Sequence, residues 1–167
     1  MLGSTATMRA ALVRAVHHAR HRSAFGALLV DQPLMRNVLA DLALESEAAT
    51  VLAMRLAHAV DAGEDDLSRL GVALGKFWVC KRTPGFVAEA LECLGGNGYV
   101  EESGLPLRYR EAPLNSVWEG SGNVNALDVL RALAREPEVL AAWITEVGHA
   151  RGGDARLDRA VDDTLEL

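Results

Sequence analysis

Residues 33–62 read PLMRNVLADLALESEAATVLAMRLAHAVDA, and this stretch decides the fold class. Its apolar residues recur mostly at steps of three and four, which places them on one face of a helix. They are Leu34, Val38, Leu39, Leu42, Leu44, Val51, Leu52, Leu56 and Val60. Pro33 suits the first turn of a helix, and Gly63 suits the left-handed residue that ends one. The stretch therefore predicts one helix of about 45 Å, longer than most helices of globular proteins.

The same periodicity predicts three more helices around this one. The first covers residues 4–22, and its apolar face consists of Met8, Ala11, Leu12, Ala15, Val16 and Ala19. The third covers about residues 66–94, and Pro84–Gly85 is expected to kink or break it. The fourth covers residues 120–135, and the residues expected to face the core are Val124, Leu127, Leu130, Leu133 and Ala134.

A long connection over residues 95–118 separates the third helix from the fourth. It is rich in glycine, proline and charge, so it is expected to be irregular, but its aromatic and aliphatic residues predict that it is ordered. The sequence therefore predicts an all-α fold: an antiparallel four-helix bundle of long helices with a long ordered loop before the fourth. Residues 1–135 form this bundle. Residues 136–167 are expected to form a short helix and the truncated start of a further helical domain.

Composition agrees with helix packed on helix. Half of the 167 residues are hydrophobic and only 5% are aromatic. This composition is typical of packed helices whose contacts consist mainly of alanine and leucine. The net charge of −6 gives no general attraction to nucleic acid or to an anionic membrane. Neither a signal peptide nor a stretch of about 20 apolar residues is present, so a cytoplasmic protein is expected.

Cys80 and Cys93 are predicted to be buried free thiols. His17, His18 and His21 lie along the first helix, and His17 and His21 are four residues apart, but no metal site is predicted because no carboxylate or cysteine stands near them in sequence.

Two segments at helix ends have features of ligand binding. Residues 22–33, RSAFGALLVDQP, join an arginine, an aromatic ring and a glycine, a set that can clamp a phosphate and stack on a ring. The alternative is a polar helix end capped by Gly26. Residues 94–99, LGGNGY, contain three glycines that let a backbone approach a ligand closely. A plain helix terminator explains this second segment equally well.

A third segment carries the candidate for catalysis. Residues 115–123, NSVWEGSGN, place Glu119 beside Trp118 at the expected start of the fourth helix. A carboxylate in this position can act as a base toward a carbon acid. The alternative is that Glu119 only complements the positive end of the helix dipole.

Taken together and in this order, the three segments resemble the C-terminal domain of acyl-CoA dehydrogenases, over residues 2–133. That family has Arg-x-x-Phe-Gly after the first helix, Gly-Gly-x-Gly-Tyr/Phe after the third, and an aromatic residue followed by Glu-Gly-Thr/Ser at the start of the fourth. The resemblance implies FAD-dependent dehydrogenation of an acyl-CoA thioester, in which Glu119 removes the α-proton and the β-hydride leaves for the flavin. It also implies a homo-oligomer, because each FAD is shared between neighbouring subunits.

The resemblance assigns the remaining site residues to FAD. Arg22, Phe25, Gly95 and Gly96 are expected to contact the FAD of a neighbouring subunit, and Ser121 and Asn123 the FAD of their own. Gln32 and Trp118 complete the set of cofactor-binding residues. The family's N-terminal helical domain and middle β-domain supply most contacts to the flavin ring. The 167 residues alone are therefore expected to bind FAD weakly and to be inactive.

Four stretches resemble one branch of the family, which responds to DNA alkylation. They are residues 32–36 (QPLMR), 79–82 (VCKR), 86–90 (FVAEA) and 115–123. The branch has an extra C-terminal helical domain, whose beginning residues 154–161, DARLDRAV, resemble. An alternative function follows: a flavin-containing DNA-protection protein with vestigial dehydrogenase activity. The tail mixes three arginines with five acidic residues, so nucleic-acid binding by this chain is not expected.

Overall fold

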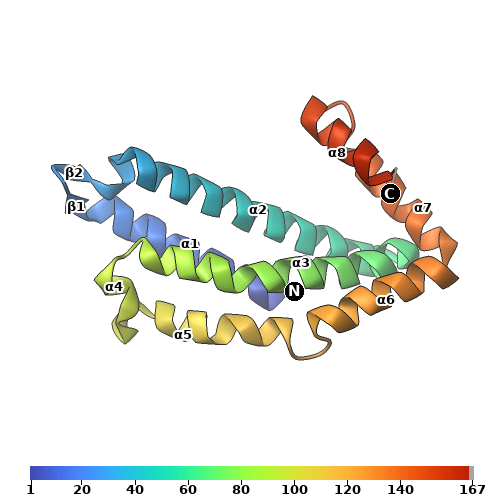
Figure 1. Ribbon diagram of the computed structural model, residues 1–167, viewed down its shortest axis with the longest axis horizontal. Coiled ribbons are helices and arrows are strands. Elements are labelled where there is room, and N and C mark those ends of the chain that lie inside the picture. The colour runs from blue at the N-terminus through green and yellow to red at the C-terminus, as the bar shows by residue number, and fades with distance from the viewer. Residues whose placement is uncertain (166–167) are drawn as a thin grey trace.

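The computed structural model describes residues 1–165 and confirms the all-α class (Figure 1). Three long helices lie side by side: α1 (Leu2–His21), α2 (Pro33–Ala62) and α3 (Asp65–Glu92). Each of them contacts the other two. α2 has the predicted bounds, with Pro33 in its first turn and Gly63 in the left-handed region at its end (φ 72°). α1 buries the predicted face, including Met8 and Ala15.

The fourth position of the bundle is occupied by two separate pieces. α5 (Leu105–Glu111) and the 3-10 turn η3 (Ala112–Ser116) lie along the C-terminal half of α3, and α6 (Gly122–Arg135) lies along its N-terminal half (Figure 1). The connection over residues 95–118 is ordered, as predicted, but it is not irregular. Besides α5 and η3 it contains α4 (Gly96–Tyr99) and the 3-10 turn η2 (Glu101–Ser103). Short helical turns satisfy backbone groups that an irregular segment on this surface would leave to water.

α3 does not break at Pro84–Gly85, so of the predicted kink or break the break is wrong. Pro84 lies inside one continuous helix, although an interior proline costs about 3 kcal/mol. The buried residues Thr83 and Phe86 flank it. α3 is also the central helix, against which α1, α2, α5, α6 and α7 all pack. Tertiary packing on several sides therefore outweighs the local cost of the proline.

The prediction of which face of α6 packs on the core is also wrong. Val124, Leu127 and Leu130 are 56%, 61% and 63% exposed, and Leu133 and Ala134 are exposed as well. α6 instead packs through Val129 and Ala132, which join Leu70 of α3 in a small apolar cluster. Since α6 rests against α3 along one edge, it buries a narrow face of smaller side chains and leaves its leucine face open.

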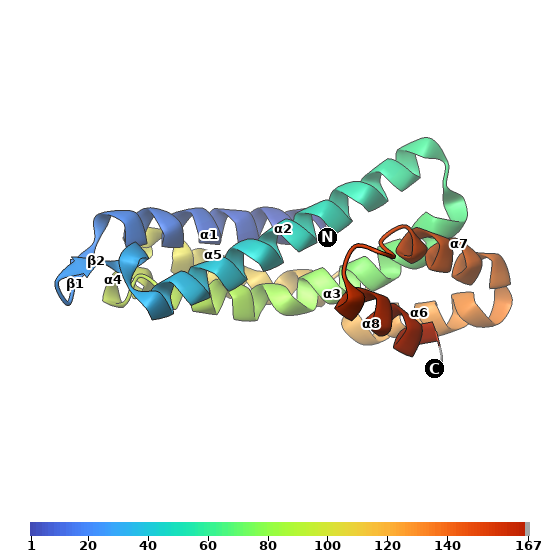
Figure 2. The same ribbon diagram turned by 90° about the horizontal axis from the view of Figure 1, so that it is seen from above.

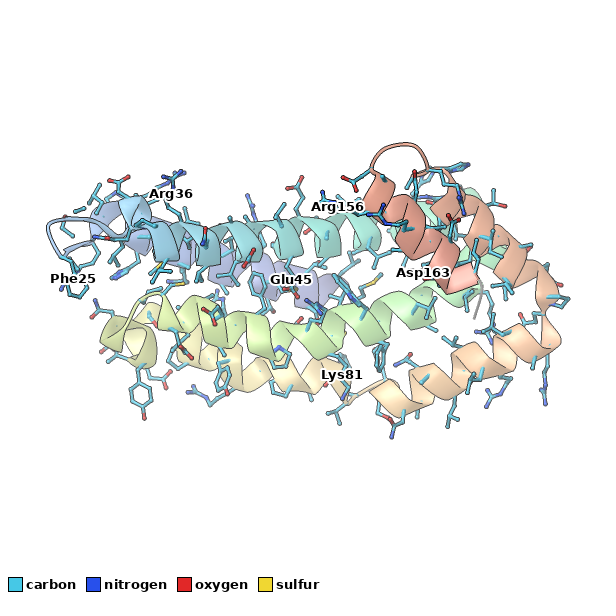
Figure 3. All side chains as sticks on the ribbon, turned by 45° about the horizontal axis from the view of Figure 1, so that its top comes forward. Phe25, Arg36, Glu45, Lys81, Arg156 and Asp163 are labelled. Atoms are coloured by element: carbon cyan, nitrogen blue, oxygen red, sulfur yellow. The ribbon has the colours of Figure 1, made fainter. Side chains whose placement is uncertain are left out.

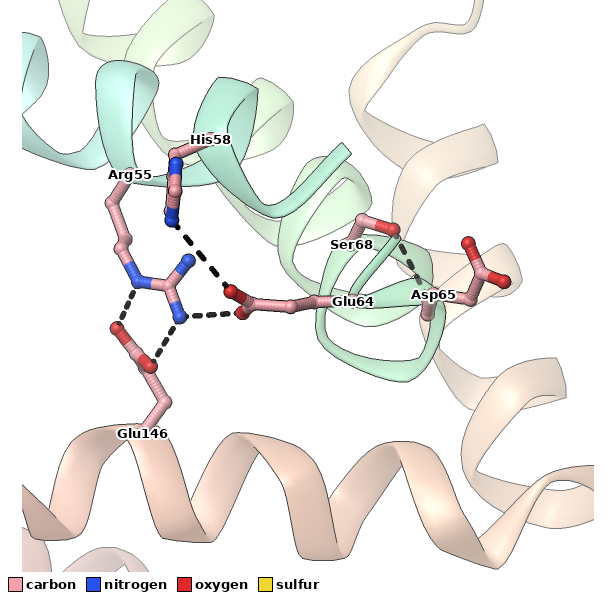
Figure 4. A network of polar contacts seen from close by, with 6 residues as sticks. All are labelled: Arg55, His58, Glu64, Asp65, Ser68 and Glu146. Carbon is pink, nitrogen blue, oxygen red and sulfur yellow. Dashed lines mark hydrogen bonds and ion pairs between the residues drawn. The ribbon is translucent and has the colours of Figure 1, made fainter. Parts of the chain in front are cut away.

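α7 (Pro137–Gly148) and α8 (Ala155–Leu165) follow the bundle. α7 packs on α3, and Val139 joins the cluster around Leu70. α8 turns back beside α7 (Figure 2). α7 and α8 both lie in residues 136–167, where the sequence predicted a short helix and the start of a further helical domain; residues 166–167 lie outside the described part. Figure 4 shows how Arg55 of α2 holds α7 by hydrogen bonds to Glu146, while it also binds Glu64.

A short hairpin, which the sequence did not predict, joins α1 to α2. β1 (Ser23–Ala24) pairs antiparallel with β2 (Ala27–Leu28), and the 3-10 turn η1 (Leu29–Asp31) leads into α2. Phe25 (φ 54°) and Gly26 (φ 82°) form the two-residue turn. Both lie in the left-handed region that the tightest hairpin turns require.

The two cysteines and the lengths of the helices bear on predictions made from the sequence. Cys80 and Cys93 are buried free thiols, as predicted. Burial, with smaller contributions from Glu89 and Glu92, raises the pKa of Cys93 to about 11. At neutral pH it is therefore a protonated thiol rather than a nucleophile. Within residues 1–165, none of the helices combines enough length and apolar character to cross a bilayer.

Candidate functional site

Glu119 lies in a tight turn between η3 and α6, beside the middle of α3. Its φ of 51° and the φ of 101° at Gly120 put two successive residues in the left-handed region. For a residue with a side chain this conformation costs about 1–2 kcal/mol, so surrounding contacts must hold it. The Glu119 side chain is exposed. Its carboxylate has no ion pair or hydrogen bond among the described residues, so it is available to a ligand.

Two side chains that the sequence did not single out hold this turn. Lys76 of α3 donates to the backbone carbonyls of Trp118, Glu119 and Gly120, at 2.7, 2.7 and 3.0 Å. Asn125 of α6 donates from Nδ2 to the carbonyls of Gly120 and Ser121, at 2.9 and 3.0 Å. The only sequence signal for Lys76 was that it is one of two lysines in an otherwise apolar stretch of α3, and the carbonyls that it binds are distant in sequence.

Trp118, Ser121 and Asn123 lie around the same turn. The Trp118 ring is half-exposed, and its Nε1 donates to Asn115 Oδ1 at 3.1 Å. Ser121 occupies the N-cap position of α6, but its hydroxyl makes no capping bond. Asn123 is exposed in the first turn of α6. The four sequence-predicted residues of this segment are thus close together, with polar groups left open.

Arg22, Phe25 and Gln32 lie at the hairpin end of the bundle. Phe25 is 97% exposed at the hairpin tip (Figure 3). Arg22 is also exposed, and no carboxylate of residues 1–165 pairs with it. Gln32 uses its amide Nε2 to donate to the Ala24 carbonyl at 3.1 Å, which ties the start of α2 to the hairpin. Its amide oxygen is left for a ligand.

Gly95 and Gly96 lie at the same end of the molecule, where α3 ends (Figures 1 and 2). Gly95 has φ 57° and ψ −140°, a conformation in which glycine is strongly favoured. Both glycines are exposed, and a Cβ on either would meet nothing within 4 Å. At these two glycines the backbone is open to a close approach.

The structure divides the predicted site residues into two groups. The hairpin group, defined as Arg22, Phe25, Gln32, Gly95 and Gly96, lies at one end of the bundle. The Glu119 turn contacts α3 at Lys76, and about 24 Å of helix separates Lys76 from Glu92. One chain therefore presents the Glu119 carboxylate and the hairpin group at different places along α3.

The histidines do not add to either group. The ring centroids of His17 and His21 lie 4.3 Å apart, and His21 Nδ1 lies 2.7 Å from the His17 carbonyl oxygen. Among residues 1–165 there is no group of three side chains able to hold a metal ion.

The sequence matches the family model described as acyl-CoA dehydrogenase, C-terminal domain, over residues 1–134. The Escherichia coli K12 protein AidB is 49% identical over 164 residues, a match that covers 96% of this chain and 30% of AidB. The chain thus spans about 30% of the length of this curated relative.

Two solved structures resemble the fold. Caenorhabditis elegans ACDH-11 in complex with C11-CoA superposes with a TM-score of 0.81 at 29% identity, over 95% of this chain and 29% of that one. Butyryl-CoA dehydrogenase from Megasphaera elsdenii gives a TM-score of 0.73 at 27% identity, over 79% of this chain and 34% of that one.

Proposed function

The chain belongs to the acyl-CoA dehydrogenase family, and we propose that it supplies the catalytic base and part of the flavin site for FAD-dependent dehydrogenation of an acyl-CoA thioester. The observation that carries this proposal is the exposed, unpaired Glu119 carboxylate in a strained turn held by Lys76 and Asn125. Strained backbone held by specific contacts is typical of active sites.

The residues of the hairpin group fit a flavin dinucleotide. Phe25 offers an open aromatic face for stacking, and Arg22 offers a guanidinium without an ionic partner among the described residues. Planar guanidinium donors match the geometry of phosphate oxygens. The open backbone at Gly95 and Gly96 allows a ribose or diphosphate to lie close. We propose that this group, including the amide oxygen of Gln32, holds the FAD of a neighbouring subunit.

Around Glu119, we propose that Trp118, Ser121 and Asn123 contact the flavin of their own subunit. Glu119 accepts the α-proton of the thioester through its carboxylate. The electron pair of that C–H bond forms the new double bond as a hydride leaves the β-carbon. FAD, when bound, supplies the acceptor for this hydride. The other proposed roles of the chain are to bind FAD and to orient the substrate and the carboxylate.

The test is Glu119→Gln in the protein that carries this bundle together with its flavin-binding domains. Glutamine keeps the shape but cannot accept the proton, so exchange of the substrate α-proton with deuterated solvent should be abolished. Glu102→Gln, which removes an exposed carboxylate in η2, serves as the control. Undiminished exchange in Glu119→Gln would rule out this base.

We further propose that the 167 residues alone hold flavin weakly and turn over no acyl-CoA. The chain corresponds to about 30% of the length of a curated relative. Its hairpin group lies at one end of the bundle and Glu119 lies beside the middle of α3, so the two do not line one site within a single chain. Purified chain should be colourless. Yellow protein with one bound flavin per chain would contradict this.

DNA protection, the alternative function, gains no support from the tail. Arg151 pairs with Asp162 at 2.6 Å and Arg156 pairs with Asp154 at 2.9 Å. These pairs neutralise two of the three tail arginines, so α8 offers no continuous basic face for phosphates.

A further inference from the structure

Lys76 makes an unusual set of contacts for a lysine. Its ammonium group has three N–H donors, and three successive carbonyl oxygens accept from it: those of Trp118, Glu119 and Gly120. All three distances are 3.0 Å or less. No carboxylate among residues 1–165 pairs with this ammonium. The backbone carbonyls of one turn therefore stabilise its positive charge.

The turn needs such a cation. Three consecutive carbonyls directed at one point bring the negative ends of their dipoles together, which is unfavourable unless a positive charge lies between them. The same turn contains Glu119 and Gly120 at positive φ. Removing the ammonium would leave the carbonyl oxygens mutually repulsive and the strained conformation without its main support.

Lys76 is well placed to fix the turn relative to the rest of the molecule. It lies in the middle of α3, between the buried residues Gly75 and Val79, on the helix against which most of the bundle packs. The contacts use only backbone atoms of Glu119, so they leave its side chain free. Asn125 of α6 donates a further hydrogen bond to the Gly120 carbonyl.

We infer that Lys76 is a positioning residue for Glu119: its ammonium holds the backbone of the turn so that the carboxylate projects toward the substrate. This inference rests on the proposed function, in which Glu119 is the base. Arginine should not replace Lys76, because its planar guanidinium cannot place three donors at the one point on which the carbonyls converge, as a compact ammonium does.

The contact itself can be tested in the chain alone, without activity. The sequence contains only two lysines, Lys76 and Lys81, and Lys81 is exposed on the same helix. With ¹⁵N-labelled lysine, NMR near neutral pH should show one ammonium signal protected from solvent exchange. That signal should vanish in Lys76→Met and persist in Lys81→Met. Equally fast exchange of both lysines would overturn the inference before any variant is made.

The functional consequence is tested in the flavin-containing protein with Lys76→Met, Lys76→Arg and Lys81→Met. Lys76→Met should lower kcat by about 10²-fold, the size expected when a catalytic group is misplaced by about 1 Å, with little change in KM. Lys76→Arg should not restore the rate, and Lys81→Met should match the unmodified protein. Thermal melting of each variant separates loss of fold from loss of position.

Glu119→Gln, measured in parallel, separates the role of Glu119 as base from the positioning role of Lys76. If it loses α-proton exchange while Lys76→Met keeps full kcat, the role of Lys76 is overturned and the base stands. If Glu119→Gln keeps exchange, both the base and the positioning role are overturned.

Discussion

Arg55 binds Glu146 through two parallel hydrogen bonds, from Nε at 2.7 Å and from Nη2 at 2.8 Å. The pair joins α2 to α7 across 91 residues of sequence. Nη2 also donates to Glu64, the N-cap residue of α3, at 2.6 Å, so one guanidinium of α2 binds both the start of α3 and the last turn of α7 (Figure 4). This contact fastens the C-terminal helices to the bundle, and its ionic nature makes the attachment depend on pH.

The Arg55–Glu146 pair should weaken in acid. Its hydrogen bonds hold the pKa of Glu146 below the ordinary value. A depressed carboxyl pKa contributes stability above the unfolded value of 4.5, and that contribution disappears as pH falls through the lowered pKa. Glu146→Gln should therefore melt a few degrees below the unmodified chain at pH 7, and the difference should be smaller at pH 3, below the unfolded value of 4.5. Glu47→Gln, on an exposed part of α2, is the control. An equal difference at both pH values would contradict the assignment.

Gly98 should tolerate no side chain. A Cβ there would lie 2.1 Å from the backbone oxygen of Leu91, which cannot move without disturbing the end of α3. Gly98→Ala should lower the free energy of unfolding by about 1–3 kcal/mol, as overpacking does. Gly96→Ala in the same short helix, where a Cβ meets nothing within 4 Å, is the matched control. Chemical denaturation of both variants gives the comparison, and similar values for the two would refute the close approach.

Phe25 should matter for flavin and not for folding. Its ring is almost fully exposed, so removing it deletes no packing. Phe25→Asn keeps a residue that tolerates the left-handed region. The variant should melt at the temperature of the unmodified chain, while the flavin-containing protein should lose affinity for FAD. A large drop in melting temperature with unchanged FAD binding would show that the ring has a structural role instead.

The open leucine face of α6 should drive association. Val124, Leu127 and Leu130 form an exposed apolar row on this helix, and such patches commonly mark interfaces. Leu127→Gln with Leu130→Gln should shift the chain toward monomer in sedimentation velocity. Leu34→Gln with Leu44→Gln, which removes exposed leucines from α2, is the control. A monodisperse monomer before any substitution would rule out association through α6.

Local sequence determined the long helices α1 and α2 and the residue types that can take part in chemistry. Steps of three and four along α1 and α2, the capping Gly63 and the first-turn Pro33 define elements whose causes lie within a few residues. The same holds for the three segments that carry Glu119, Phe25 and the glycines. Their order along the chain was enough to indicate the family.

Tertiary structure decided what depends on contacts between distant residues. α3 stays continuous through Pro84 because several helices pack against it, and α6 exposes its leucines because it meets the bundle along one edge. No local pattern could link Lys76 to a turn more than forty residues away. The long-range hydrogen bonds form only after the helices have packed, and they fix the conformation of Glu119.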